Sequence, residues 1–142
     1  MKRMKVMLMV MLAGGMIWMS TGCAQKSVSI ADLAGEWEIV EVNNKLVSAE
    51  ETPFLGFNVA EKQLYGNTGC NSLMGNLETD DNQEDALSFG ALGSTKRMCA
   101  DMATEDAILQ ALGAVKGFAL DGLNLVLKDA DGSELMELKK KP

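Results

Sequence analysis

The segment NTGCNSLMG, residues Asn67–Gly75, constrains the fold more than any other part of the chain. Cys70 stands directly between Gly69 and Asn71, and further glycines lie at both sides of this group. A cysteine among glycines is typical of a turn that needs unusual backbone angles. The cysteine could be a nucleophile, a metal ligand, a redox thiol or half of a disulfide. The rest of the sequence argues against some of these four possibilities.

The N-terminal residues predict export. Met1–Lys5 carries three positive charges, and Val6–Met19 is an uncharged apolar run of fourteen residues. This length is typical of a signal peptide and is short for a membrane span of roughly 20 residues. Ser20–Cys23 (STGC) follows, and a small residue before a cysteine at this place resembles a bacterial lipoprotein signal. The resemblance implies cleavage before Cys23 and diacylation of its sulfur, although Ser20 stands where an aliphatic residue is usual. An ordinary secretory signal is the alternative.

These features divide the chain into three expected segments. They are a lipoprotein signal peptide at residues 1–22, a lipidated tether at 23–31 and one domain at 32–142. Two or three acyl chains hold a protein durably on a membrane. We therefore expect a lipid-anchored protein of the cell envelope. Ala24 after the lipidated cysteine favours the outer membrane, with the domain facing the periplasm.

The composition argues against several classes of function. The 142 residues include 13 basic, 20 acidic and no histidine residues. Loss of residues 1–22 removes three basic residues, so ten basic residues then face twenty acidic ones. Such an acidic surface argues against nucleic acid binding and against contact with anionic membrane patches. Without histidine, the commonest general base and the commonest zinc ligand are both missing.

The remaining metal signals are weak, and we expect no metal and no cofactor. Seven of the eleven methionines lie in the signal segment, so the high methionine content does not indicate a copper-binding domain. Met74, Met98, Met102 and Met136 remain, and we expect them at core or near-core positions. Asp129–Glu134 (DADGSE) lacks the acidic residues that complete a calcium loop, so a hairpin turn is the better interpretation.

Alternating apolar residues predict a mostly β domain. Trp37, on the first strand, is expected to point inward, and Asn43-Asn44 and Asp121-Gly122 are turn signals. Strands are predicted within residues 32–43, 54–67 as a hairpin, 72–79, 86–96, 115–128 as a hairpin, and 134–139.

One helix is predicted within residues 101–115, with Asp101 or Thr104 as its cap and Glu105 in an early turn. The predicted fold class is therefore α+β and mostly β. It is a small antiparallel, partly open barrel-like sheet of about seven or eight strands with one packed helix.

The cysteines beyond the lipid site form an even pair. Because Cys23 is assigned to lipid, Cys70 and Cys99 remain, and two cysteines of an exported domain more often form a disulfide than anything else. The closed loop would contribute about 3–4 kcal/mol. A nucleophilic cysteine would need an activating base, and only Lys96 and Arg97 are near in sequence. We predict no catalytic residue. Two cysteines without a histidine are even weaker evidence for a zinc site than for a catalytic cysteine.

Several segments together resemble the META domain, the HslJ-like lipoproteins of bacterial envelopes. They are LAGEWEIVEVN, GNTGCNSLMGNLE, LSFGALGSTKRMCAD, ATEDAILQAL and LDGLNLVLKDADGSELMEL, within residues 33–138. The resemblance implies a small barrel-like β fold with one helix, and an envelope or stress-linked lipoprotein without established catalytic activity. The motif positions, for which it implies a structural role, are Gly69, Cys70, Asn71, Thr95, Met98 and Cys99.

The expected function is that of a non-enzymatic envelope lipoprotein. It would be anchored to the membrane by lipid and would act through contacts with an envelope protein in envelope maintenance or stress tolerance. The alternative is a lipocalin-like barrel that binds a small apolar ligand, lined by Trp37, Phe57 and Phe89. Such side chains more commonly fill a small barrel completely. The sequence indicates no oligomeric state.

Overall fold

The structure is a computed structural model, and it describes residues 28–142. The expected signal peptide, the lipid site Cys23 and the first part of the tether lie outside the described residues. The end of the tether belongs to the packed domain, because Val28 and Ile30 contact the hydrophobic core. No helix within residues 28–142 is both long enough and apolar enough to cross a membrane.

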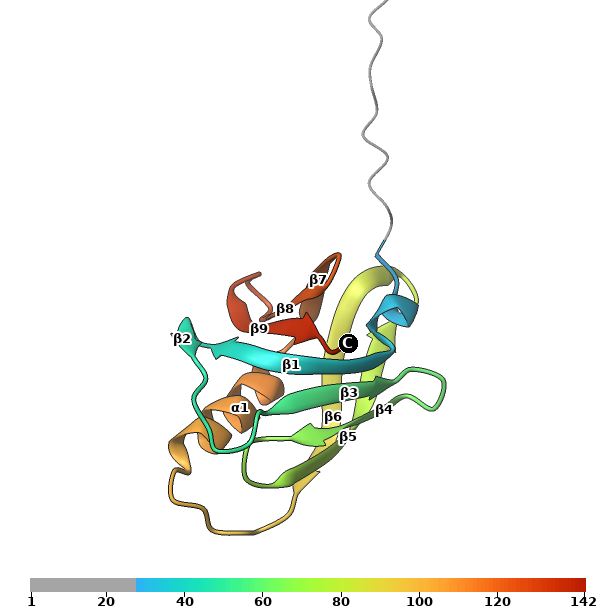
Figure 1. Cartoon of the computed structure of the whole chain (residues 1–142). Helices are drawn as coiled ribbons and strands as arrows, with labels where there is room; N and C mark the ends of the chain where they lie inside the picture. Colours follow the sequence, from blue (N-terminus) through green and yellow to red (C-terminus); the bar gives the residue numbers. More distant parts are fainter. Residues whose placement is uncertain (1–27) are drawn as a thin grey trace, which may run out of the picture.

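The described chain contains a 3-10 helix, nine strands and an α-helix (Figure 1). Their bounds, in chain order, are η1 Ile30–Leu33, β1 Gly35–Val42, β2 Lys45–Leu46, β3 Phe54–Asn58, β4 Gln63–Asn67, β5 Ser72–Asp80, β6 Gln83–Ser94, α1 Ala103–Ala114, β7 Gly117–Asp121, β8 Asn124–Lys128 and β9 Glu134–Lys140.

The strands form one antiparallel sheet that closes on itself. Its order is β2-β1-β3-β4-β5-β6-β7-β8-β9, and β1 also pairs with β9. Eight strands therefore form the ring, and the two-residue β2 is attached to β1 outside it. The ring is thinnest between β6 and β7, where Ala86 and Gly117 form a single pair. The predicted antiparallel barrel-like sheet with one packed helix is confirmed, and β1–β9 pairing closes the ring that the sequence predicted to be partly open.

The interior is filled by side chains from the strands and from both helices. Trp37 points inward as predicted and is only 1% exposed, and its indole N–H donates to the Leu33 carbonyl oxygen at 2.9 Å. This bond ties β1 to η1 at one end of the barrel. The helix α1 packs against β6, β1 and β9, and it buries Ile108 and Leu112 completely.

Hairpin turns form at both predicted turn signals, Asn43-Asn44 as expected and the second one residue later than expected, at Gly122-Leu123. Asn43 and Asn44 have φ values of 51° and 64° between β1 and β2. Gly122 has a φ of 58° between β7 and β8. Positive φ is what a two-residue hairpin turn requires, and asparagine and glycine reach it at low cost. These residues therefore set the register of the strands on either side of them.

Candidate functional site around the disulfide

The loop between β4 and β5 is shaped by Gly69. Its φ is +92°, and a side chain there would place Cβ only 2.9 Å from Cβ of Ala49. The Gly69 N–H donates to Oδ1 of Asn67 at 2.6 Å, which closes a small turn at the end of β4. A residue with a side chain would be strained at this position for two reasons, the backbone angle and the close contact. The turn directs Cys70 toward the segment before α1.

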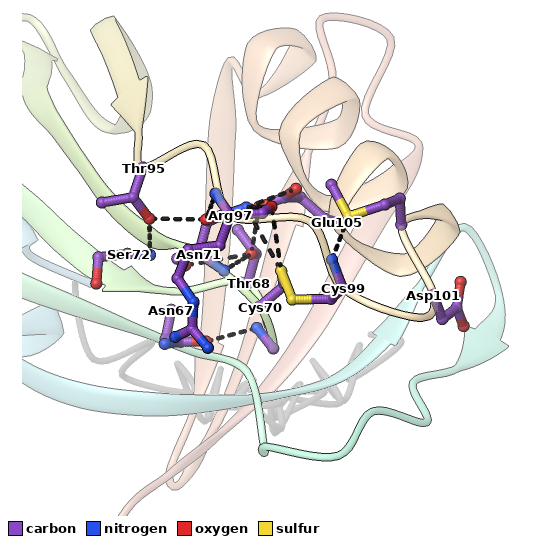
Figure 2. The surroundings of a disulfide bond; sticks show 12 residues. Asn67, Thr68, Cys70, Asn71, Ser72, Thr95, Arg97, Cys99, Asp101 and Glu105 are labelled. Atoms are coloured by element: carbon purple, nitrogen blue, oxygen red, sulfur yellow. Dashed lines mark hydrogen bonds between the residues drawn. A yellow bond between two sulfur atoms is a disulfide. The ribbon is translucent and has the colours of Figure 1, made fainter.

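Cys70 and Cys99 are joined by the predicted disulfide (Figure 2). Their Cα atoms are 6.0 Å apart, and 29 positions separate them in the sequence. Cys70 is only 6% exposed, whereas Cys99 is half-buried. The bond links the β4–β5 loop to the segment that connects β6 with α1. A disulfide sulfur carries no thiol proton and is not a nucleophile, so the structure contains no free cysteine at this site.

Asn71 is the centre of a hydrogen-bond network beside the disulfide (Figure 2). Its Oδ1 accepts from Thr95 Oγ1 at 2.8 Å and from the Arg97 backbone N–H at 2.7 Å. Its Nδ2 donates to the Arg97 carbonyl oxygen and to Glu105 Oε2, both at 3.0 Å. The side chain is 1% exposed, so these partners replace water. Asn71 therefore holds the β4–β5 loop, the segment after β6 and the start of α1 together.

Glu105 is a buried carboxyl group, with an exposed fraction of 4%. Thr68 Oγ1 donates to its Oε1 at 2.8 Å, and Asn71 Nδ2 donates to its other oxygen. The Asn71 backbone N–H in turn donates to Thr68 Oγ1 at 3.1 Å. Two neutral donors thus satisfy the carboxyl group inside the protein. Among the described residues, every buried side-chain nitrogen or oxygen has a hydrogen-bond partner.

The structure brings together most of the motif residues singled out in the sequence. Gly69, Cys70, Asn71, Thr95 and Cys99 all lie in or beside the network. Met98 does not, because its side chain is 86% exposed.

The expectation that the four methionines occupy core or near-core positions is therefore wrong for Met98, and also for Met74, which is 70% exposed. Met136 is buried as expected, and Met102 is half-buried with its sulfur 3.5 Å from the Cys99 backbone N–H.

Sequence reasoning missed Thr68 and the inward orientation of Glu105. An acidic residue in the first turn of a helix is usually a surface residue that favours the helix dipole. The available signal was its phase, because Glu105 lies three residues before Ile108 and seven before Leu112, on the buried stripe of α1. The expected side-chain cap is also different: α1 begins after Met102 without a capping side chain, although Asp101 accepts from the Ala103 N–H at 2.9 Å.

A small cleft lies next to the disulfide. Its volume is about 70 Å³, and its lining includes Thr68, Gly69, Cys99 and Asp101. Sites for metabolites and cofactors commonly measure about 300–1,000 Å³, so this cleft is too small for such a molecule. Within residues 28–142, no group of three or more His, Cys, Asp or Glu side chains could hold a metal ion. The interactions observed at the site are hydrogen bonds and one disulfide crosslink.

Comparisons with known proteins agree with this architecture. A sequence model of the META domain family matches residues 31–142. An NMR structure of a protein from Burkholderia xenovorans is similar over 78% of this chain and 85% of its own, with 20% identity and a TM-score of 0.58. A second NMR structure shares 21% identity over 75% of this chain and 89% of its own, with the same TM-score.

A crystal structure of a DUF4847 family protein from Bacteroides vulgatus shares 10% identity over 77% of this chain and 94% of its own, with a TM-score of 0.55. No curated protein sequence matches the chain. At these identities the similar structures show a shared fold and nothing about activity.

Proposed function

Because this chain belongs to the META domain family, we propose that it is a lipid-anchored envelope protein whose domain acts through contacts with other proteins, without catalysis. Cys23 would carry the lipid, and the described domain would be presented from the membrane surface. The acidic domain would remain soluble there, since like charges keep such domains apart.

The observation that carries the proposal is that the polar motif residues form their hydrogen bonds with groups inside the protein. The Asn71 side chain bonds to Glu105, to Thr95 and to the Arg97 backbone. Both Glu105 carboxyl oxygens accept from side chains of the protein, Thr68 and Asn71. Cys70 is bonded to Cys99 and cannot act as a thiolate. Catalytic groups need a reactive atom that a substrate can reach, and these groups point into the protein. The motif thus supports a rigid scaffold, which suits a domain that works by presenting its surface.

The apolar-ligand alternative gains no support from the barrel interior. Trp37 and Phe57 are 1% and 2% exposed, and Phe89 packs beside Phe57 with ring centroids 6.3 Å apart. These side chains belong to one packed core with the leucines of the facing strands. A ligand inside the ring would have to displace core side chains, which costs several kcal/mol for each large residue.

A fatty-acid labelling experiment tests the anchor. Cells that express the full chain are given an alkyne-tagged fatty acid, and membrane and soluble fractions are separated. We expect label and membrane location for the natural chain and for Cys70→Ser/Cys99→Ser, and neither for Cys23→Ser. Label that persists in Cys23→Ser would contradict the lipid site.

The proposal that the domain contacts other proteins is tested separately, by crosslinking in intact envelopes. A photo-reactive residue is placed at exposed positions of the domain, such as Met98 and Leu123. We expect a discrete crosslinked protein from at least one face, with loss of the product when the domain is unfolded by reduction and heat. Absence of any crosslinked protein from every face would count against action through protein contacts.

A further inference from the structure

The outer surface of β4 and β5 carries a face of unusual composition. Its outward residues form three directly opposed pairs across the two strands, with Leu64 and Leu73 buried on the other side. These pairs are Gln63 with Asn76, Tyr65 with Met74, and Asn67 with Ser72. We call these six residues the tyrosine face. β3 and β6 flank it in the sheet.

The tyrosine face has no charged residue, although the domain is strongly charged. Residues 28–142 contain twenty acidic and nine basic side chains. The nearest charges along the two strands are Glu61 and Lys62, in the turn before β4, and Glu78, further along β5. Beside Tyr65, Glu36 and Lys141 form an ion pair at 3.1 Å, so the two charges there offset each other. Asparagine, glutamine and serine side chains donate and accept hydrogen bonds without charge. The composition therefore suits an uncharged partner that offers many hydroxyl or amide groups.

The ring of Tyr65 extends from β4 over Gly56 of the neighbouring strand β3. A Cβ on Gly56 would lie 2.1–2.6 Å from three ring atoms, so the glycine makes room for the ring to lie against the β3 backbone. Phe54 touches the ring edge-on, with centroids 6.5 Å apart. Tyr65 is nevertheless 38% exposed, and Met74 beside it is 70% exposed. On the far side of Met74 lies Gly93, whose Cβ position is open space.

The size of the surface limits the kind of partner. Together with its flanking strands β3 and β6, the tyrosine face spans three gaps of about 4.8 Å, and its three rows cover about 14 Å along the strands. The resulting area is about 200 Å², whereas a stable protein interface buries about 800 Å² on each partner. A surface of this size with one exposed aromatic ring fits a few sugar rings. The C–H face of a pyranose packs on an aromatic face, and its hydroxyls reach the flanking amides.

We propose that the tyrosine face binds a short stretch of an uncharged pyranose polysaccharide. Tyr65 supplies the stacking surface, and Gln63, Asn76 and Ser72 supply hydrogen bonds to hydroxyl or acetamido groups. The negative charge of the domain disfavours anionic polymers. This proposal is independent of the lipid anchor and of a protein partner.

The test is an NMR titration of the full chain in detergent micelles with two neutral probes, chitotriose and maltotriose. We expect saturable shift changes at the amides of β3 to β6 with at least one probe. Tyr65→Ala should weaken binding by at least about tenfold, because the ring contact is lost. Asn76→Ala changes an exposed residue and should leave the stability of the fold unchanged, but it should weaken sugar binding severalfold. A preference for chitotriose identifies acetamido recognition and a preference for maltotriose identifies hydroxyl recognition, and either supports the proposal.

Two control variants separate binding from folding. Tyr65→Phe keeps the ring over Gly56 and should retain most of the affinity. Leu123→Ala changes an exposed apolar residue next to the β7–β8 turn and should leave the affinity unchanged. Shift changes with neither probe at millimolar concentration, or changes equal in Tyr65→Ala, would overturn the proposal. Shifts at this face that depend on protein concentration without sugar would also overturn it, because they would identify an interface between two copies.

Discussion

Asn71 uses every hydrogen-bonding position of its side-chain amide to join three parts of the chain. Its oxygen faces two donors, at Thr95 and Arg97, and its nitrogen faces two acceptors, at Arg97 and Glu105. No other side chain has the same shape with both a donor and an acceptor end. Aspartate has nearly the same size but replaces the donor end by a second acceptor. The identity of this one residue is therefore fixed by its surroundings.

We predict that Asn71→Asp lowers the free energy of unfolding by about 3–5 kcal/mol, as expected for an uncompensated buried charge. The new carboxylate oxygen would face the Arg97 carbonyl and the Glu105 carboxyl without a proton between them. Urea denaturation followed by circular dichroism measures the change. Asn76→Asp makes the same substitution at an exposed position of β5 and should change stability by at most about 0.5 kcal/mol. Equal losses in both variants would contradict the assignment.

Tyr65 gives the protein a weak pH dependence at alkaline pH. Its pKa is raised above the ordinary value of 10.0, first by burial and then by the negative charge of Glu36, while Lys141 acts in the opposite direction. A raised pKa means that the folded state holds the phenol proton more tightly than the unfolded state. The stabilisation is complete below pH 10 and is lost as the pH rises through the folded pKa. Tyr65→Phe should lack this component, which urea curves on either side of pH 10 would reveal. An identical pH dependence in both proteins would refute it.

At the scale of elements, the disulfide and the Asn71 network connect the same two segments in different ways. The network stabilises the folded state through contacts around Asn71, Arg97 and Glu105. The disulfide between Cys70 and Cys99 acts mainly on the unfolded chain, because it removes conformations from a loop of about 30 residues. The segment between β6 and α1 has no regular structure, so the disulfide and the network fix the start of the helix, while its buried apolar side packs on the barrel.

We predict that Cys70→Ser/Cys99→Ser lowers the free energy of unfolding by about 3–4 kcal/mol, the loop-closure contribution for this length. The folded structure should persist, because the Asn71 network remains. Urea denaturation of the variant and of the natural protein with and without a reductant measures the effect. Reduced natural protein should match the variant closely. A loss below about 1 kcal/mol in both would show that the unfolded chain gains little freedom when the bond is absent.

Local features of the sequence determined the elements that could be predicted. The turn signals at Asn43-Asn44 and Asp121-Gly122 are short-range, because positive φ is a property of one or two residues. The alternation around Trp37 and the apolar stripe of α1 are equally local. For Glu105 the helix phase was local, but the partners that allow its carboxyl group to be buried were not: Thr68 and Asn71 lie 37 and 34 positions away.

For the molecule as a whole, closure of the ring depends on pairings between distant parts of the chain. β1 and β9 pair over residues 37–42 and 136–140, which joins the two ends of the domain. The pairing between β6 and β7 is the opposite case, with one residue pair, across which the Leu87 N–H donates to the Lys116 carbonyl oxygen at 3.2 Å. The helix α1 lies between these two strands in the chain and packs on β6. The ring is thus closed by many residue pairs between β1 and β9 and by a single pair between β6 and β7. We call the β6–β7 pairing the weak seam.

We predict that the weak seam opens before the rest of the molecule unfolds. The amide of Leu87, bonded across the seam, should exchange with solvent through a local opening of low free energy. Amides within the β1–β9 ladder, such as those of residues 37–42, should exchange only through global unfolding. Native-state hydrogen exchange at low urea concentrations distinguishes the two. Local opening depends little on urea because it exposes little surface, whereas global unfolding depends strongly on it. If Leu87 and the β1–β9 amides show the same free energy and the same urea dependence, then the packing of α1 holds the β6–β7 seam as firmly as backbone pairing holds the other.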